Sequence, residues 1–546
     1  MLRPQLSALV VVAALSVGVA GPRAQSAIAY TLTFAEREQR IMQVDATFTD
    51  VPAAPLQLRM SRSSPGRYAL HEFGKNVFDV RAADASGKPL TVTQVSPHQW
   101  DVSGHSGEVR LTYRVFGSRV DGTYLGIDPL HAHINMPAAI MWARGFDERP
   151  ISIRFQPPPG ASWRVATQLL PGRDALTFAA PNLQYLMDSP AELSDFALRT
   201  FTVPDGGRTP VFKVAVHHGG SDADLDALVR DVETIVREAR TVFGEFPAFE
   251  GNTYTFIADY LPGNDSDAME HRNSTFLTSP TPLSSGRSTH IGSVSHEFCH
   301  AWNVERIRPA SLEPFNFEEA NVSGELWLAE GFCNYYGDLV LRRSGMMSVR
   351  DYARAIASTL STVVASPARK FRSPVEMSRL ASLIDGATFA DPSNITDTSI
   401  SYYTWGEAIG VGLDLTLRDR SDGRVTLDDY MRTLWEQFGR SAARAPGYVP
   451  TPYTLADLKN TLADVSGDAN FAAQFFARYV EGREVVDYAR LLSRAGFVLR
   501  PRAGARASMA ETAYEVVPAE ETGEPLADTQ RRFRDAWLSS PARNVF

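Results

Sequence analysis

The sequence is poor in cysteine and in histidine. Two cysteines, Cys299 and Cys333, and 11 histidines occur among 546 residues. At most one disulfide can therefore form. Two buried thiols that pack between helices are slightly favoured over a bridge, because a sequence does not supply the separation that a disulfide requires. With so few histidines, a regular spacing between two of them is informative.

The chain also lacks long basic runs and, beyond its N-terminus, long apolar segments. Lys and Arg number 54 against 63 Asp and Glu, which gives a net charge of -9. No cluster of Lys and Arg is long enough to form a phosphate-binding stripe, so nucleic acid is not an expected partner. No later segment is long and apolar enough to anchor the chain in a membrane.

The N-terminus has the pattern of a secretory signal. Arg3 precedes an apolar run, residues 6–20, which is short for a membrane span. Small residues follow at positions 18–20 and again at 24–26, and no cysteine follows to carry a lipid. We therefore predict a signal peptide over residues 1–26 and an exported bacterial protein, periplasmic or secreted, without a stable membrane anchor. The alternative is a buried N-terminal helix.

The next part of the chain is predicted to be β structure. The composition, 44% hydrophobic and 21% charged, is that of a globular protein with two to four domains. Alternating segments such as 30–34, 109–115 and 151–155 are separated by turns rich in proline, glycine and aspartate, which favours an antiparallel sandwich over residues 27–205. The histidines of this region are interpreted as structural; they are His71, His98, His131 and His133.

Helical patterns dominate after a turn-rich stretch, residues 204–208, which we interpret as a linker. Residues 222–243 have apolar positions at helical spacing and a candidate cap at Ser221. Further helices are predicted over 349–364 and 405–418, and the chain stays largely helical to residue 497. The tail from residue 501 is rich in alanine, glutamate and arginine and is expected to be partly mobile.

A metal-binding motif lies in the middle of the chain. His296 and His300 are four residues apart, so on a helix their rings project from one face and can share a cation, which is expected to be zinc. Glu297 lies beside that face, where it can take a proton from the attacking water. The alternative is a pair of solvated or hydrogen-bonded helix histidines.

Glu330 is the candidate third ligand. It lies 30 positions after His300 in an apolar stretch with Trp327 and Phe332, where an unpaired carboxylate would be costly. Two imidazoles and one carboxylate leave a fourth position open, as in catalytic rather than structural zinc sites. A surface charge on a helix is the alternative for Glu330.

Several stretches resemble one peptidase family. The sequence from His296 to Pro309, HEFCHAWNVERIRP, is similar to the signature of the bacterial glycyl aminopeptidases, metallopeptidase family sixty-one. The resemblance extends to Trp327–Phe332, Ser401–Gly406 and Pro65–Tyr68, and so covers most of residues 30–500. Glu305 is a departure, because the family usually has lysine there.

The resemblance implies an α+β multidomain fold. An N-terminal antiparallel β-sandwich domain, residues 27–205, would precede a thermolysin-like catalytic domain, residues 210–345, and a C-terminal helical domain, residues 346–500. Residues 501–546 are too few for the complete PDZ domain that family members often carry.

The resemblance also implies the roles of the site residues. One Zn²⁺ per chain would be held by His296, His300 and Glu330, with Glu297 as general base. Tyr403 would donate a hydrogen bond to the developing oxyanion, with Tyr402 as the rival and packing as the other reading.

Glu270 would bind the substrate's free ammonium group from an edge strand, unless it is a solvated loop residue. Asn334, one turn after Glu330, could orient a ligand histidine.

The expected function is that of a zinc aminopeptidase, which acts on peptides with a free N-terminus and a small first residue, glycine or alanine. Two alternatives stay open, an endopeptidase of the same fold and a catalytically silent peptide-binding protein. The oligomeric state is not predicted.

Overall fold

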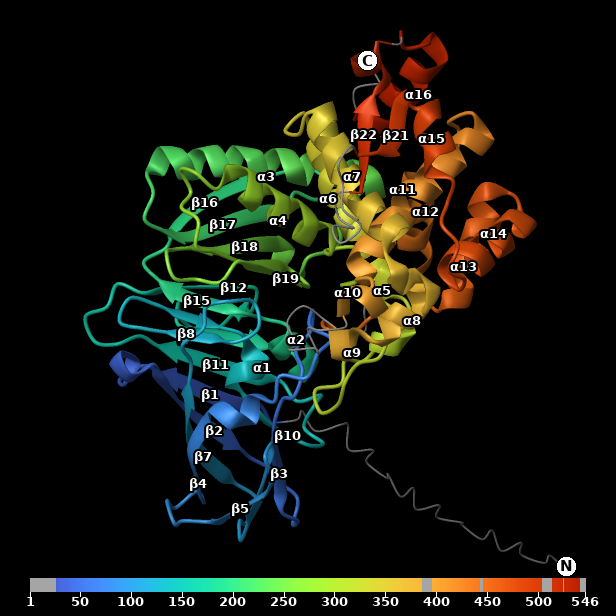
Figure 1. Ribbon diagram of the computed structural model, residues 1–546. Coiled ribbons are helices and arrows are strands. Elements are labelled where there is room, and N and C mark those ends of the chain that lie inside the picture. Colours follow the sequence, from blue (N-terminus) through green and yellow to red (C-terminus); the bar gives the residue numbers. More distant parts are fainter. Residues whose placement is uncertain (1–25, 385–394, 442–444, 503–512, 524, 541–546) are drawn as a thin grey trace, which may run out of the picture.

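The computed structural model describes residues 26–384, 395–441, 445–502, 513–523 and 525–540 (Figure 1). The predicted signal peptide, residues 1–26, therefore lies almost wholly outside the described residues. Within them, no helix is both long enough and apolar enough to cross a membrane. The mixed α+β multidomain fold expected from the sequence is confirmed.

The N-terminal part contains three sheets around one hydrophobic core. The largest has the strand order β13 (Leu170–Pro171), β14 (Thr177–Ala180), β11 (Ile151–Gln156), β1 (Ile28–Thr33), β2 (Ile41–Phe48), β7 (Val109–Phe116) and β4 (Val77–Ala83). The second has the order β10 (Met141–Ala143), β3 (Leu56–Met60), β6 (Gln99–Ser103) and β5 (Thr91–Ser96). The third has the order β12 (Arg164–Thr167), β15 (Ala191–Ser194), β9 (Ala132–Ile134) and β8 (Leu125–Ile127).

Most strand pairs of these sheets are antiparallel, as expected, but β1 and β11 run parallel. The alternation of buried and exposed residues along β1, β2 and β11 predicts strands, and the structure has them. Alternation has the same period in both kinds of sheet, so it does not reveal strand direction. The parallel pair joins segments more than 100 residues apart, which local turn signals cannot indicate.

A mixed five-stranded sheet follows, in the order β16 (Ala197–Thr202), β17 (Val211–His218), β18 (Thr253–Tyr260), β20 (Ser274–Ser279) and β19 (Asp267–His271). The three inner strands are parallel, and the edge strands β16 and β19 are antiparallel to their neighbours. Residues 204–208, interpreted from the sequence as a linker, form the turn between β16 and β17. β16 therefore belongs to this central sheet.

Two helices pack on the central sheet (Figure 1). α3 (Asp222–Phe243) begins at Ser221, whose side chain forms a capping box with Asp224, and ends at Gly244 in the left-handed conformation. Its apolar face shares one core with strands β17 and β18 and with α4 (Arg287–Cys299). α4 carries the first part of the metal-binding motif, and β19 carries Glu270.

The rest of the chain is mainly helical and packs beside the central sheet (Figure 1). The helices are α5 (Leu326–Ala329), α6 (Gly331–Ser344), α7 (Val349–Ala365), α8 (Pro374–Arg379), α9 (Ala381–Ile384), α10 (Ile395–Thr398), α11 (Tyr402–Ser421), α12 (Leu427–Leu434), α13 (Leu455–Ser466), α14 (Ala469–Phe475) and α15 (Tyr488–Arg494).

Two described segments of the C-terminal tail have regular structure. β22 (Tyr514–Pro518) pairs with β21 (Phe497–Pro501), and α16 (Asp528–Leu538) follows. Trp537 of α16 is fully buried, and its indole N–H donates a hydrogen bond to Tyr335 on α6 at 2.9 Å. The polar composition of the tail had indicated partial mobility, but a few apolar side chains are sufficient to dock these segments.

Two glycines bring α11 against the junction of α5 and α6. A Cβ atom on Gly406 would lie 1.8 Å from the Trp327 carbonyl oxygen, and one on Gly331 would lie 2.3 Å from the Gly406 Cα. Only glycine permits this backbone approach. Because Glu330 adjoins Gly331 and Tyr403 lies one turn before Gly406, the contact sets the distance between two candidate site residues.

We expect Gly406→Ala to destabilise the fold by about 1–3 kcal/mol, because the added methyl group must push two backbones apart. Gly292→Ala in α4 is the matched control. A Cβ atom there would have no neighbour within 4 Å, so this helical substitution should stabilise by about 0.5–1 kcal/mol. Urea unfolding followed by circular dichroism measures both, and equal effects would contradict the close contact.

Candidate metal centre and active site

His296 and His300 converge at the end of α4. His296 lies in its last turn, and His300 is the C-cap residue with helical backbone angles. Their Nε2 atoms are 3.0 Å apart. His300 Nδ1 lies 2.7 Å from the Asn303 carbonyl oxygen, to which it donates when protonated, and this tautomer leaves a lone pair on Nε2. Asn334 lies near His296, and its role as an orienting residue stays a prediction.

Glu330 faces both histidines from the junction of α5 and α6. Its Oε2 atom is 3.3 Å from His300 Nε2 and 3.8 Å from His296 Nε2. The carboxylate is 1% exposed. Burial is the largest single influence and opposes its ionisation, but His300, His296 and the Tyr68 hydroxyl group together lower the pKa of the Glu330 carboxyl group.

These three side chains fit a bound zinc ion. Nitrogen and oxygen ligands about 2.0–2.2 Å from a tetrahedral zinc lie roughly 3.3–3.6 Å from one another. The separations of 3.0, 3.3 and 3.8 Å scatter around that range. Two lone pairs that face each other across 3.0 Å repel unless a cation or a proton lies between them. The donor set of two imidazoles and one carboxylate therefore matches the ion predicted from the sequence.

Glu297 lies beside this donor set and is 5% exposed. Within the described residues, its Oε2 atom has no hydrogen-bond partner although it is buried. Burial raises the pKa of Glu297 to about 8; the nearby Glu330 adds to this shift, and His300 opposes it. A carboxylate that is not engaged by the protein can take up a proton from a molecule in the site.

The two candidate tyrosines lie in different surroundings at the start of α11. Tyr402 is 1% exposed and packs edge-on against Tyr68, with ring centroids 5.9 Å apart. Tyr403 is only partly buried, and its ring centroid is 6.3 Å from that of His296. Tyr403 also lines a cavity of about 390 Å³, which is bordered by Arg67 and Asp267 as well. The geometry therefore favours Tyr403 over Tyr402 as the phenol that faces a ligand.

Glu270 projects from the edge strand β19 toward the donor set. A carboxylate oxygen of Glu270, a ring nitrogen of His300 and an oxygen of Glu330 all lie within 4.8 Å of one another. Glu270 is 5% exposed, and burial raises the pKa of its carboxyl group well above the usual range; the adjacent Glu330 adds to this shift. Such a carboxylate favours a cationic partner strongly.

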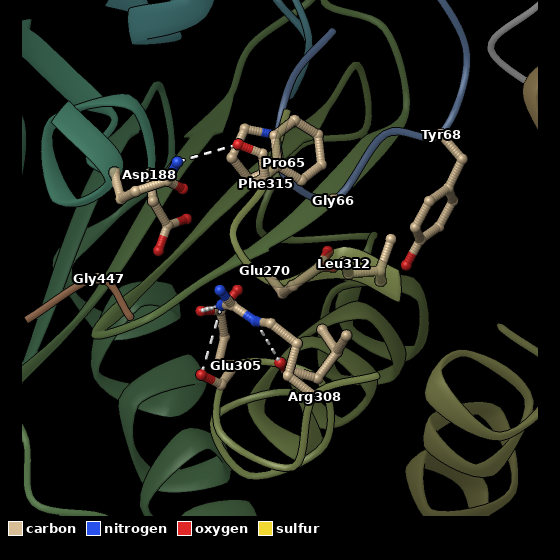
Figure 2. Close-up of a pocket in the computed structure, with 12 residues that line it drawn as sticks. Pro65, Gly66, Tyr68, Asp188, Glu270, Glu305, Arg308, Leu312, Phe315 and Gly447 are labelled. Carbon is tan, nitrogen blue, oxygen red and sulfur yellow. Dashed lines mark hydrogen bonds and ion pairs between the residues drawn. The ribbon is translucent and has the colours of Figure 1, made fainter. Parts of the chain in front are cut away.

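A small cavity lies beside Glu270 (Figure 2). Its volume is about 30 Å³, and Tyr68, Glu305 and Arg308 are among its lining residues. Glu305, at the position where the family usually has lysine, is buried and pairs with Arg308 at 2.9 Å. The charge reversal is therefore compensated inside the protein.

The loop that closes this cavity comes from the N-terminal part of the chain. Gly66 has a φ of +76°, and a Cβ atom there would lie 2.4 Å from Met269 Sδ and 2.9 Å from Glu270 Oε2. A side chain at this position would displace Glu270. Tyr68 of the same loop donates a hydrogen bond from its hydroxyl group to Glu330 Oε1 at 2.6 Å.

The hydrogen bond of Tyr68 to Glu330 was not predicted from the sequence. The Pro65–Tyr68 stretch was part of the family resemblance, but it carried no predicted role. The loop lies about 260 residues before Glu330, so no spacing pattern connects the two. Its hydrogen bond holds one carboxylate oxygen and leaves the other directed at the histidines.

All six predicted site residues lie around one centre: His296, His300, Glu330, Glu297, Glu270 and Tyr403. Cys299 and Cys333 are both buried and unbridged, in agreement with the favoured expectation of two thiols.

Solved structures with a similar fold include two bacterial proteins. An aminopeptidase N family protein from Idiomarina loihiensis matches with a TM-score of 0.77 at 24% identity, over 87% of this chain and 79% of that one. An M1 zinc metallopeptidase from Deinococcus radiodurans matches with a TM-score of 0.50 at 15% identity, over 85% of this chain and 95% of that one. At such identities the likeness concerns the fold. None of the curated proteins is significantly similar in sequence.

Two family models match the sequence. The M61 peptidase N-terminal domain matches residues 29–195, and the M61 glycyl aminopeptidase matches residues 289–409. Together they cover more than half of the chain, and the second includes the His-Glu-x-x-His motif and Glu330. The chain therefore belongs to the M61 glycyl aminopeptidase family and is a metallo-aminopeptidase.

Proposed function

We propose that this protein is an exported zinc aminopeptidase that removes small N-terminal residues, glycine or alanine, from peptides. The observation that carries the proposal is the position of Glu270. A buried carboxylate within 4.8 Å of two candidate metal ligands can hold a substrate's ammonium group next to the scissile bond. Export rests on the N-terminal sequence pattern alone.

One zinc ion per chain would be held by His296, His300 and Glu330. When bound, zinc supplies Lewis-acid polarisation of the scissile carbonyl group and of the attacking water. Tyr68 and the Asn303 carbonyl keep Glu330 and His300 oriented toward the ion through their hydrogen bonds.

Glu297 and Tyr403 would carry the proton transfer and charge stabilisation. Glu297 takes a proton from water as the water oxygen attacks the scissile carbonyl carbon. The Tyr403 hydroxyl donates a hydrogen bond to the carbonyl oxygen while negative charge develops there. As the carbon–nitrogen bond breaks, Glu297 delivers its proton to the leaving amine, which restores the carboxylate.

The shape of the site favours removal of one small residue. On the Glu270 side the cavity holds about 30 Å³, the space of roughly two water molecules, which suits a small side chain better than a long one. On the Tyr403 side the cavity is about 390 Å³. A peptide can therefore extend away from Glu270, whereas residues ahead of the ammonium group would meet the Gly66 loop.

The decisive experiment compares free and blocked substrates. We expect the wild type to release p-nitroaniline from Gly- and Ala-p-nitroanilide, and to leave their N-acetyl derivatives intact. Glu270→Ala should lower kcat/KM on the free substrates by at least roughly 30-fold, because loss of a buried charged partner costs about 2–5 kcal/mol. Asp464→Asn, at an exposed position of α13, should leave kcat/KM near the wild-type value. Equal cleavage of free and acetylated substrates would refute the aminopeptidase proposal and favour an endopeptidase.

Glu297→Gln tests the general base separately from metal binding. The amide keeps the size of the side chain but cannot accept the proton, so kcat should fall by about 10²–10⁴-fold while the zinc content stays at the wild-type level. A chelator should abolish wild-type activity, and added zinc should restore it. Glu233→Gln, on the exposed face of α3, provides the control. A Glu297→Gln variant with near-normal kcat would exclude this residue as the base.

Tyr403→Phe and Tyr402→Phe form a matched pair that differs only in which hydroxyl group is removed. Loss of a donor to the oxyanion lowers kcat by about 10²–10³-fold. We expect this loss for Tyr403→Phe, with KM nearly unchanged, and a change of less than about 3-fold for Tyr402→Phe. Steady-state kinetics on Ala-p-nitroanilide measures both, and the reverse order would assign the phenol to Tyr402.

A further inference from the structure

A second cluster of possible metal ligands lies where the N-terminal part meets the central sheet. It consists of His131, Glu192, His217 and Asp259, and all four residues are buried. His131 immediately precedes β9, and Glu192 lies in β15 of the same sheet. His217 and Asp259 lie on the neighbouring strands β17 and β18 of the central sheet. Three strands, and the residue just before a fourth, therefore direct polar groups from two sheets to one buried point.

The ligand atoms have the spacing of a metal site. His131 Nδ1 lies 3.1 Å from Asp259 Oδ2 and 3.3 Å from Glu192 Oε1. His217 Nδ1 lies 3.2 Å from Asp259 Oδ1 and 3.7 Å from Glu192 Oε1. These four separations resemble the roughly 3.3–3.6 Å between ligands of one tetrahedral zinc ion.

The buried carboxylate of Asp259 is not stabilised by hydrogen bonds from the part of the chain that the structure describes. Its side chain is buried, yet within the described residues neither of its oxygens accepts a bond with hydrogen-bond geometry. The same holds for His217 Nδ1. The ring nitrogens lie close to the Asp259 oxygens, but the ring N–H directions do not point at these oxygens. His131 Nδ1 is instead placed to donate to Glu192 Oε1 at 3.3 Å when it carries a proton. Leaving a buried carboxylate in this state costs several kcal/mol unless another positive group lies between the ligands.

The outer atoms of the two imidazoles face further carboxylates. His131 Nε2 lies 3.3 Å from Asp128 Oδ2, and His217 Nε2 lies 3.8 Å from Asp195 Oδ1. Asp128 favours a proton on His131 Nε2, and this tautomer directs the Nδ1 lone pair of His131 inward, whereas Asp195 lies beyond hydrogen-bond distance of His217. A carboxylate behind each ligand histidine is the usual outer arrangement of protein metal sites.

The electrostatics of the cluster favour a cation. Two buried carboxylates, those of Glu192 and Asp259, face the two imidazole rings across 3.1–3.7 Å. The second oxygen of Glu192 contacts His133 Nδ1 at 3.2 Å, which holds the carboxylate in place. A divalent ion would balance the charges of Glu192 and Asp259 with both rings neutral.

We propose that His131, Glu192, His217 and Asp259 bind a second divalent transition-metal ion, with zinc as the best match, in a closed structural site. Two imidazole nitrogens select zinc-like ions over calcium and magnesium, which prefer oxygen ligands. Four protein ligands complete a tetrahedron and leave no position for substrate. The ion would join β9 and β15 to β17 and β18, and so hold the N-terminal part against the central sheet. The site shares no ligand with the proposed catalytic centre.

Metal content of the full-length chain tests this proposal without reference to activity. After dialysis against excess zinc and then buffer, we expect the wild type to retain two zinc ions per chain by native mass spectrometry and inductively coupled plasma mass spectrometry. The double variant His296→Gln with His300→Gln should retain one. The double variant His217→Gln with Asp259→Asn should also retain one, at the other site.

The catalytic-centre variant keeps the test decisive even if the His217 and Asp259 variant does not fold. The His296→Gln, His300→Gln variant should keep the ion of the second cluster. Removing that ion with a chelator should lower the melting temperature of the variant by several degrees, because a ligand that binds only the folded state stabilises the fold. Loss of all zinc from the His296 and His300 variant would overturn the proposal and show that the second cluster holds only protons. One zinc ion per wild-type chain, lost with His296 and His300, would have the same meaning.

Discussion

The carboxylate of Glu330 contacts side chains from two other parts of the chain. Glu330 is the N-cap residue of α6, it faces the two histidines at the end of α4, and it accepts a hydrogen bond from Tyr68 of the N-terminal loop. A buried charge of this kind is stable only with partners of opposite charge or with donors. The requirement explains why an N-terminal loop reaches into the site, and why the N-terminal β region and the helical part cannot be positioned independently.

Close backbone packing supplies the remaining geometry. The contact between Gly331 and Gly406 brings the start of α11 to the start of α6, so that Tyr403 reaches the histidine side of the site. Gly66 performs the corresponding task for Glu270. At each of these positions glycine leaves space that a Cβ atom would fill, and a neighbouring candidate site residue depends on that space. Gly66 also lines the small cavity beside Glu270.

Local patterns in the sequence predicted the local parts of this arrangement. The amphipathic pattern and Ser221 predicted α3 with its observed ends, and the four-residue spacing of His296 and His300 predicted their convergence. Contacts between distant segments carried no such signal. Neither the hydrogen bond of Tyr68 to Glu330 nor the parallel pairing of β1 with β11 leaves a periodic trace in the sequence.

His131 illustrates the limit most clearly. The sequence shows it as one of several scattered histidines in a β region, for which a structural role was the reasonable interpretation. Its neighbours Glu192, His217 and Asp259 come from three other strands, and only strand pairing across two sheets brings them together. A motif on one helix fixes its own spacing, whereas a cluster assembled from separate strands depends on the complete fold.

The cluster at the end of α4 and the cluster around His131 have similar ligand types but differ in ligand number and in access. Both combine two imidazoles with carboxylates in a buried setting. Around the α4 histidines, one carboxylate completes the donor set, Glu297 keeps an oxygen unengaged, and cavities lie beside Glu270 and beside Tyr403. Around His131 and His217, two carboxylates close the set between packed sheets. The number of protein ligands and the access to them, rather than the ligand types, separate a centre that can bind substrate from one that can only hold strands together.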